Sequence, residues 1–194
     1  MEKVSYALGL SLGNNLAGSG VTGLNVAKLA QGIQDVLSQK EPEMGFEEAQ
    51  AVINEYFSAL QAKMSEKAQG EGKAFLAENA KRSEVITLAS GLQYEILTPG
   101  TGAIPTSTDS VKVHYHGTTI DGNVFDSSVK RGEPATFGVT QVISGWVEAL
   151  QLMPVGSKWK LFIPSELAYG AQGAGQAIPP HASLVFEVEL LDIV

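Results

Sequence analysis

The chain contains no cysteine, which excludes disulfide bonds, thiolate metal sites and a cysteine nucleophile. It also has no basic region, because acidic side chains outnumber basic ones on both sides of residue 90 and the formal net charge is −8. A chain of this charge offers no electrostatic footprint to nucleic acid or to an anionic membrane surface. We therefore expect neither a nucleic-acid partner nor a membrane partner.

Long apolar runs are missing as well. No stretch approaches the length needed to span a bilayer, and the opening "MEKVSYALGL" is too short and too interrupted for the apolar core of a signal peptide. We expect a cytoplasmic protein, with the periplasm left open in case a signal peptide has been removed. At 194 residues the chain is long enough for one large domain or two small ones.

Motifs for metal, nucleotide or hydrolase chemistry are weak. His114 and His116 share an expected strand face, but no third ligand is near, so a solvated face is the better interpretation. Ser127 and Ser128 lack a G-x-S-x-G context. The "GSGVTG" of residues 18–23 matches a dinucleotide-binding pattern, yet it follows a helical segment and not a strand. We expect no metal and no cofactor.

What the first part of the chain does contain is helical periodicity. Apolar residues recur at a spacing of four from Val4 to Leu16, and a second helix reads from Asn25, a good N-cap, to Leu37. A long third helix is predicted from about Glu47 to Lys81. We expect residues 1–85 to form one helical domain.

These helices carry more apolar surface than so short a segment can bury on itself. We expect a homodimer through the N-terminal helices, although the short helices could instead pack on the rest of the chain. Gly70 and Gly72 interrupt the long helix and weaken it by roughly 1 kcal/mol each. Two interpretations of them stay open: they let the helix flex, or they are mere imperfections.

After residue 90 the apolar period becomes two. Strands are predicted around "SGLQYEIL", "ATFGVTQVI", "GSKWKLFIP" and "SLVFEVELLDIV". "DSVKVHYHGTTIDGNVFD" is predicted to form two strands joined by a hairpin turn at Asp121-Gly122-Asn123, and "SGWVEALQLM" one short helix. The fold class is α+β: a helical N-terminal region with a long connecting helix, then an antiparallel sheet wrapped over one short helix. Residues 86–194 form this second domain.

Two features of the second domain suggest a binding site. Asp126 lies among apolar residues in "VFDSSVKRGEPATF", where a carboxylate is costly unless it is paired or used. A bland turn, with Asp126 bonding nearby amides, is the alternative. The long Gly-rich segment "PSELAYGAQGAGQAIPPHAS" is the second feature, since loops of this length in compact domains are usually functional.

Longer motifs decide between these interpretations. "VKVHYHGTTIDGNVFDSS", "VISGWVEALQLMPVGSKWKLFIPSELAYG" and "IPPHASLVFEVELLDI" closely resemble the FKBP-type peptidyl-prolyl cis-trans isomerases, from Gly91 to the end of the chain. The helical region, with "SYALGLSLGNNL" and the long connecting helix, resembles that of the dimeric bacterial Mip-like members. The resemblance therefore reaches nearly the whole chain.

The resemblance implies an enzyme that isomerises Xaa-Pro peptide bonds, assists protein folding, needs no cofactor, and holds unfolded clients as a dimer. Its partners would be proline-containing unfolded polypeptides, a second copy of the chain, and macrolide inhibitors. A non-catalytic chaperone or peptide-binding module is the alternative, and a structural dimer with a vestigial isomerase domain is a further one.

Family resemblance also implies the site residues. The substrate site would be formed by Tyr115, Phe125, Asp126, Arg131, Phe137, Val142, Ile143, Trp146, Tyr169, Ile178 and Phe186. The catalytic residues among them would be Asp126, Tyr169, Tyr115 and Phe186.

Individual roles follow from the same resemblance. Trp146 would form the pocket floor, and Tyr115, Phe137 and Phe186 its walls. The N–H of Ile143 and the hydroxyl of Tyr169 would hold substrate carbonyls. Asp126, oriented by Tyr115 and Arg131, would place its dipole near the twisting amide.

Three positions depart from the family's common pattern. Ala135 replaces a frequent aromatic residue, Gln141 a frequent acid, and Ala174 a bulkier loop residue. We expect a wider pocket rim and a weaker grip on large macrolides, with an intact floor and walls.

Overall fold

The computed structural model describes residues 1–175 and 177–194 and divides the chain into two compact units, residues 1–63 and 64–194. The boundary between the units falls inside the long helix α3 (Phe46–Asn79). The domain boundary at residues 85 and 86 that the sequence suggests stays a prediction.

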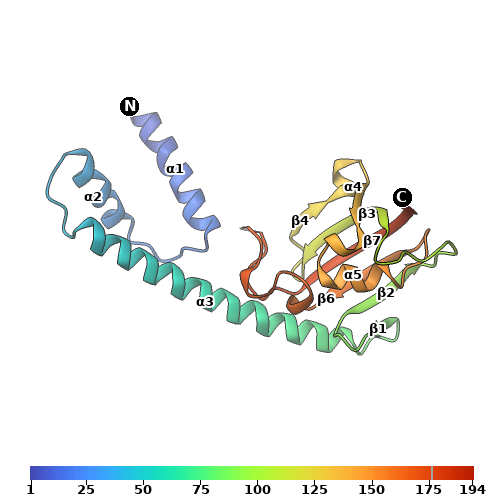
Figure 1. Cartoon of the computed structure of the whole chain (residues 1–194). Coiled ribbons are helices and arrows are strands. Elements are labelled where there is room, and N and C mark those ends of the chain that lie inside the picture. The colour runs from blue at the N-terminus through green and yellow to red at the C-terminus, as the bar shows by residue number, and fades with distance from the viewer. Residues whose placement is uncertain (176) are drawn as a thin grey trace. The chain divides into compact units, whose positions relative to one another are not determined.

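The first unit is helical, as predicted. It contains α1 (Glu2–Gly18), α2 (Val26–Leu37) and the first half of α3 (Figure 1). Asn25 caps α2 as expected, its side-chain oxygen accepting the N–H of Lys28 at 3.1 Å. This bond satisfies one of the amide groups that a helix leaves unpaired at its first turn.

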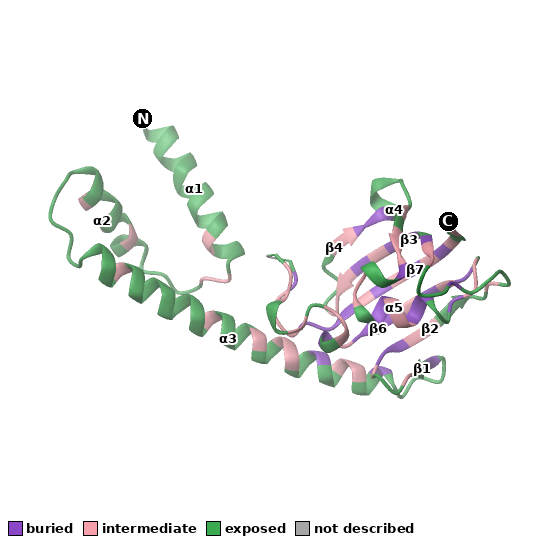
Figure 2. Ribbon diagram, viewed as in Figure 1, coloured by how far each residue is buried: buried purple, intermediate pink, exposed green. Residues whose placement is uncertain are grey.

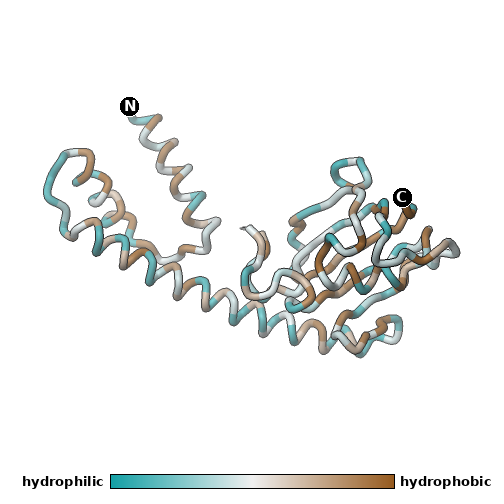
Figure 3. Tube along the Cα trace, viewed as in Figure 1, coloured by the Kyte–Doolittle hydropathy of each residue, from teal (hydrophilic) through white to brown (hydrophobic). Residues whose placement is uncertain are grey.

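Apolar side chains of this first unit are largely exposed. No residue of α1 is buried, and Tyr6 and Phe46 keep 71% and 76% of their surface accessible (Figure 2). Hydrophobic positions recur along α1 and α2 in the same exposed segments (Figure 3). The apolar periodicity of the sequence therefore marks faces that this unit does not bury by itself.

The second unit is built on an antiparallel sheet. Its strands are β1 (Val85–Thr87), β2 (Gln93–Thr98), β3 (Ser110–Thr119), β4 (Val124–Ser127), β5 (Ala135–Gly138), β6 (Lys158–Ile163) and β7 (Leu184–Ile193). The strand order is β1-β2-β6-β7-β3-β4, and β5 also pairs with β3. All pairings are antiparallel, as the hairpin signals predict.

One short helix, α5 (Ser144–Leu150), provides the other layer of the core (Figure 1). Gly145 allows it to pack closely, because a Cβ there would lie 2.6 Å from the Cγ2 atom of Ile163 on β6. Trp146, Ala149 and Leu150 of α5 are buried in the same cluster as the inward residues of β3, β6 and β7. The predicted sheet wrapped over a single helix is confirmed.

Short elements complete this unit. A single helical turn, α4 (Ser128–Arg131), follows β4, and 3₁₀ turns lie at Val139–Gln141, Ser165–Leu167 and Gly170–Gln172. The predicted Asp121-Gly122-Asn123 turn joins β3 to β4, with Gly122 at a positive φ of 87°. This turn brings Phe125 and Asp126 of β4 beside Gly117 and its neighbours on β3.

Candidate functional site

A hollow of about 450 Å³ opens between α5, the sheet and the loops beside them. It is lined by Tyr115, Phe125, Asp126, Phe137, Gln141, Val142, Ile143, Trp146, Tyr169 and Phe186. Every residue predicted for the site except Arg131 and Ile178 lines this hollow. Gln141, which the sequence singles out only as a departure from the family pattern, is also part of the wall.

Aromatic rings make up most of the hollow. Trp146 lies at its centre, 5.4 Å from the ring of Tyr115, 6.0 Å from Phe137 and 5.3 Å from Phe186, each in an edge-to-face arrangement. Phe125 meets Phe186 edge to face at 5.4 Å. Edge-to-face contacts of this kind hold the rings in defined orientations. The result is a stiff apolar pocket whose shape is set before a ligand enters.

The carboxylate of Asp126 is held at the rim by two partners. Tyr115 donates its phenolic O–H to Oδ2 at 2.5 Å, and the Nη1 group of Arg131 donates to Oδ1. Arg131 also donates from Nη2 to the Tyr115 oxygen at 2.8 Å, which closes a three-membered network. Arg131 therefore lies behind the carboxylate, to which it donates, and not in the wall itself.

This network sets the protonation states of the Asp126 carboxyl group and of the Tyr115 phenol. Burial opposes ionisation of Asp126, but hydrogen bonds from Tyr115 and Arg131 outweigh it and lower the pKa of this carboxyl. Burial, followed by the bond to Asp126, raises the pKa of the Tyr115 phenol. At neutral pH the rim thus carries an ionised carboxylate and a protonated phenol.

Besides the buried indole N–H of Trp146, two polar donors of the wall have no partner among residues 1–175 and 177–194. The backbone N–H of Ile143, at the start of α5, donates to no carbonyl or side chain there. The hydroxyl of Tyr169, whose side chain is half-exposed, makes no hydrogen bond in the same described range. Both groups are available to bind carbonyl oxygens of a ligand.

Serine side chains behind the rim hold the two hairpin strands together. Ser128 accepts the N–H of Tyr115 at 2.7 Å and meets Nδ1 of His114 at 3.1 Å. Ser127 meets Nδ1 of His116 at 2.9 Å. None of these four side chains lines the hollow. Within the described residues, no three His, Cys, Asp or Glu side chains are grouped to bind a metal ion.

Gly117 is a site-forming residue that the sequence analysis overlooked. A Cβ atom there would lie 2.7 Å from a ring carbon of Phe186 and 2.8 Å from ring carbons of Phe125. The available signal was a glycine inside an otherwise regular strand, which often marks a close approach. Its missing side chain is what lets the two phenyl rings meet over β3.

Ile178 is placed differently from the predicted wall residues. Its side chain is buried in the core cluster, and its backbone exchanges hydrogen bonds with Ala174 at 2.9 and 3.1 Å. The Gly-rich segment is therefore pinned to the core at Ile178, while Tyr169 at its start lines the hollow.

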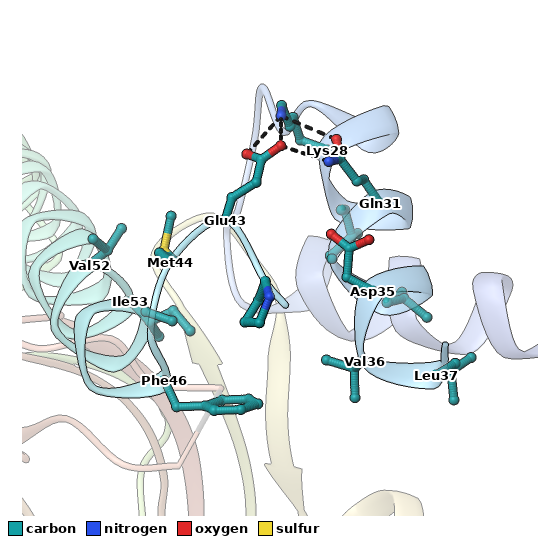
Figure 4. Close-up of a pocket in the computed structure, with 15 residues that line it drawn as sticks. Lys28, Gln31, Asp35, Val36, Leu37, Glu43, Met44, Phe46, Val52 and Ile53 are labelled. Carbon is teal, nitrogen blue, oxygen red and sulfur yellow. Dashed lines mark hydrogen bonds and ion pairs between the residues drawn. The ribbon is translucent and has the colours of Figure 1, made fainter. Parts of the chain in front are cut away.

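A larger hollow, of about 650 Å³, lies in the first unit between α2 and the start of α3. Its apolar end carries Val36, Leu37 and Phe46, and its polar rim carries Glu43 bonded to Lys28 (Figure 4). No helix of the described residues is long and apolar enough to cross a membrane.

Comparison with known proteins agrees with this geometry. A family model described as FKBP-type peptidyl-prolyl cis-trans isomerase matches residues 102–191. A second model, described as the domain amino terminal to FKBP-type peptidyl-prolyl isomerase, matches residues 1–96.

Relatives cover almost the whole chain. The FKBP-type 22 kDa peptidyl-prolyl cis-trans isomerase of Escherichia coli is 50% identical, over 98% of this chain and 94% of that protein. The Outer membrane protein MIP of Legionella longbeachae is 43% identical, over 99% of this chain and 85% of that protein. The crystal structure of FkpA from Escherichia coli superposes with a TM-score of 0.76 at 38% identity, covering 98% and 95% of the two chains.

The pocket is stiff and aromatic, and its carboxylate is held in one orientation. Both family models match the chain, and relatives of this similarity extend over almost all of it. These observations lead to one conclusion. The chain belongs to the FKBP-type peptidyl-prolyl cis-trans isomerases.

Proposed function

We propose that the aromatic hollow binds the proline of an Xaa-Pro peptide and that isomerisation of the peptide bond takes place there. The observation that carries this proposal is the position of Asp126, ionised and doubly held, at the edge of a pocket made of aromatic rings. Trp146 would support the proline ring, with Tyr115, Phe137 and Phe186 around it.

The reaction needs neither a nucleophile nor a metal, because no bond is broken. Isomerisation crosses a barrier of roughly 20 kcal/mol that arises from amide resonance. A twisted amide has lost this resonance, and its oxygen depends less on solvation by water. An apolar pocket therefore favours the twisted form over the planar one, provided that it fits the twisted shape better.

Polar groups at the rim would fix the peptide while the bond rotates. The N–H of Ile143 and the hydroxyl of Tyr169, both without protein partners in the described range, are proposed to hold carbonyl oxygens on either side of the proline. Asp126 is proposed to act on the twisting amide through its fixed dipole and not by proton transfer. Its network with Tyr115 and Arg131 keeps that dipole in one orientation.

An isomerisation assay tests this proposal. The full-length chain should accelerate isomerisation of short Leu-Pro peptides more than Glu-Pro peptides, because apolar walls disfavour an acidic side chain before the proline. Asp126→Leu should lower kcat/KM about tenfold or more. Asp192→Leu, the same change at an exposed carboxylate outside the pocket, is the matched control. Full activity in Asp126→Leu would remove the carboxylate from the mechanism.

We also propose that the first unit forms a homodimer with a second copy of the chain. The helix α1 has no buried residue, and its apolar side chains include Leu8 and Leu10, 67% and 58% exposed. The groove between α2 and α3 adds a further exposed apolar surface, lined by Ile33 and Val52 among others. A second copy would bury both surfaces at once, at about 25 cal/mol for each Å² of apolar area.

A dimer of this kind supports a further role, the holding of unfolded polypeptides. Two aromatic pockets in one particle raise the effective concentration of the second site for a long client chain. The alternative, a module that binds peptides without catalysis, predicts a different result in the isomerisation assay. It would suppress aggregation of an unfolded protein and leave the Leu-Pro isomerisation rate at its uncatalysed value.

Macrolide binding at the same pocket is part of the proposal. The floor and walls are present, but Gln141 lies along the rim and Ala135 is small and only partly buried. We expect a macrolide inhibitor to compete with the peptide. Replacement of Ala135 by Phe, the type of side chain frequent in the family, should tighten the inhibitor.

A further inference from the structure

The last turns of α3 pack against the isomerase domain along one face. From residue 65 to residue 79, buried or half-buried positions recur every three or four residues, ending in Gly72, Phe75, Leu76 and Asn79. Residues spaced in this way lie on one side of a helix. All of them belong to the same compact unit as the sheet and the aromatic site.

Gly72 is the point of closest approach. A Cβ atom at this position would lie 2.5 Å from Oγ and 3.1 Å from Cβ of Ser183. A methyl group here would displace the Ser183 hydroxyl and press on its Cβ atom, directly before the chain enters β7. Gly70, two residues earlier, is exposed and has nothing within 4 Å of its Cβ position, so the two glycines are not equivalent.

A second contact fixes the end of the helix. The side chain of Asn79 donates to Oε1 of Gln93 at 2.9 Å, and Nε2 of Gln93 donates to the backbone oxygen of Leu76 at 2.9 Å. Both Asn79 and Gln93 are buried. This contact lies about 10 Å along the helix from Gly72. The segment from Gly72 to Asn79 is thus in contact with the rest of the second unit at two separated points.

Ser183 is linked through the chain and one hydrogen bond to two residues of the candidate site. Ser183 directly precedes β7, which carries Phe186 into the aromatic wall. His181, two residues earlier, donates its N–H to the oxygen of Gly170 at 2.8 Å, beside the wall residue Tyr169. A displacement of Ser183 would therefore be passed to two side chains of the hollow.

The same helix face also backs the hairpin that carries Asp126. A small hollow of about 250 Å³ is walled by Ala68 and Glu71 of α3, by Pro179 and Ser183 of the loop, and by the β3–β4 turn at Asp121. That turn leads directly into β4. Helix α3 thus lies behind both segments that bring polar rim groups to the aromatic pocket.

We propose that Gly72 is a positioning residue for the isomerase reaction, setting through Ser183 the placement of Tyr169 and Phe186 in the aromatic site. The inference rests on the proposed function of that site and goes beyond it. It assigns the glycines of the long helix opposite roles: Gly72 is a fixed docking point, whereas Gly70 makes no contact that the reaction uses.

The test is a pair of matched substitutions in the full-length chain. Gly72→Ala should lower kcat/KM for a short Leu-Pro peptide about tenfold, since a shift of catalytic groups by a fraction of an ångström to 1 Å costs one to two orders of magnitude. Gly70→Ala should leave kcat/KM unchanged. Both are measured well below the melting temperature of each variant, so that unfolding does not enter the rate.

Restoring the activity of Gly72→Ala with a second substitution shows whether the loss comes from the contact with Ser183. Ser183→Gly removes both atoms that the new methyl group would meet, so Gly72→Ala/Ser183→Gly should recover the kcat/KM of Ser183→Gly alone. If Gly72→Ala does not fold, the double variant still decides. A folded double variant that stays tenfold below Ser183→Gly overturns the proposal, as does a Gly72→Ala variant with wild-type kcat/KM.

A failure of the pocket assignment can be distinguished from a failure of the proposal for Gly72. If Asp126→Leu retains full activity, the proposed chemistry of the pocket is wrong whatever Gly72→Ala does. If Asp126→Leu is inactive while Gly72→Ala equals the wild type in rate and only melts earlier, the pocket is right and the docking contact is structural alone.

Discussion

The hydroxyl of Tyr115 donates to Oδ2 of Asp126 at 2.5 Å while it accepts a hydrogen bond from Arg131 at 2.8 Å. One hydroxyl thereby ties together both ends of an ion pair whose side chains are about half exposed. Exposed ion pairs contribute little by themselves, because water screens them and the side chains stay mobile. The phenol adds the directionality that an isolated Asp–Arg pair would lack.

Tyr115→Phe tests this relationship, since it keeps the ring in the wall and removes only the hydroxyl. We expect kcat/KM for a Leu-Pro peptide to fall about fivefold, equivalent to about 1 kcal/mol for one lost hydrogen bond. The pKa of Asp126 should rise toward its ordinary value, because a bond that lowers it is gone. Carboxyl chemical shifts in an NMR titration report the pKa. An unchanged pKa would show that Arg131 alone sets the charge state.

The pH dependence of activity follows from the same network. The pKa of Asp126 is lowered and that of Tyr115 raised, so neither group titrates near neutral pH. We expect kcat/KM to stay flat from about pH 6 to 8 and to fall only at or below the ordinary carboxyl range near pH 4. The stabilisation from ionised Asp126 is likewise present above the unfolded-state pKa and lost as pH falls through the folded-state value. A bell-shaped profile centred near neutrality would instead indicate acid–base catalysis.

Much of this fold was predictable because its signals are local. The cap at Asn25, the period-two strands and the Asp121-Gly122-Asn123 turn each depend on a few adjacent residues. Strand β1 (Val85–Thr87) was missed, since three residues are too few to show an alternation. The turn α4 (Ser128–Arg131) is not predicted either, because one helical turn leaves no apolar period.

The candidate site was predictable only in part for a related reason. Its aromatic wall residues come from distant segments, so resemblance and not periodicity brought them together. The side chains that approach Gly117 and Gly72 belong to other segments, which the sequence does not identify. The sequence alone does not distinguish Gly70 from Gly72, because the two differ only in their tertiary contacts. Burial of Ile178 likewise depends on how the Gly-rich loop closes on itself.

The buried amide pair of Asn79 and Gln93 leads to a prediction for stability. Asn79→Ala should lower the free energy of unfolding by about 1–3 kcal/mol, because the buried side-chain oxygen of Gln93 loses its donor. Lys73→Ala, at an exposed position of the same helix, is the control and should change it by less than about 0.5 kcal/mol. Urea denaturation measures both values. Equal values for the two variants would mean that the amide pair contributes no net stability.

Truncation at two positions tests where the isomerase domain begins. The sequence places the boundary after residue 85, which predicts that a chain starting near Ser83 folds and keeps its activity. The contacts of Gly72, Phe75 and Asn79 instead predict that a chain starting at Met64 is needed. We expect the Met64 chain to retain the peptide rate of the full-length protein and the Ser83 chain to melt earlier and turn over more slowly. Indistinguishable truncations would favour the boundary at residue 85.

The dimer is tested by placing a charge on α1. Leu8→Asp puts a carboxylate on a helix that has no buried residue in the isolated chain, so the fold of one chain should tolerate it. In a dimer the same carboxylate would be buried without a partner, at a cost of several kcal/mol. We therefore expect Leu8→Asp to be monomeric by light scattering. Asn14→Asp adds the same charge at a polar position of α1 and is the control.

Two activities of the Leu8→Asp variant should then separate. Its kcat/KM on a short Leu-Pro peptide should equal that of the control, because the peptide occupies a single aromatic pocket. Its catalysis of the proline-limited refolding of a whole protein should be weaker, since a monomer offers a long client no second pocket. A Leu8→Asp variant that stays dimeric would place the interface away from α1. A parallel loss of both activities would show that the helical unit supports the pocket directly.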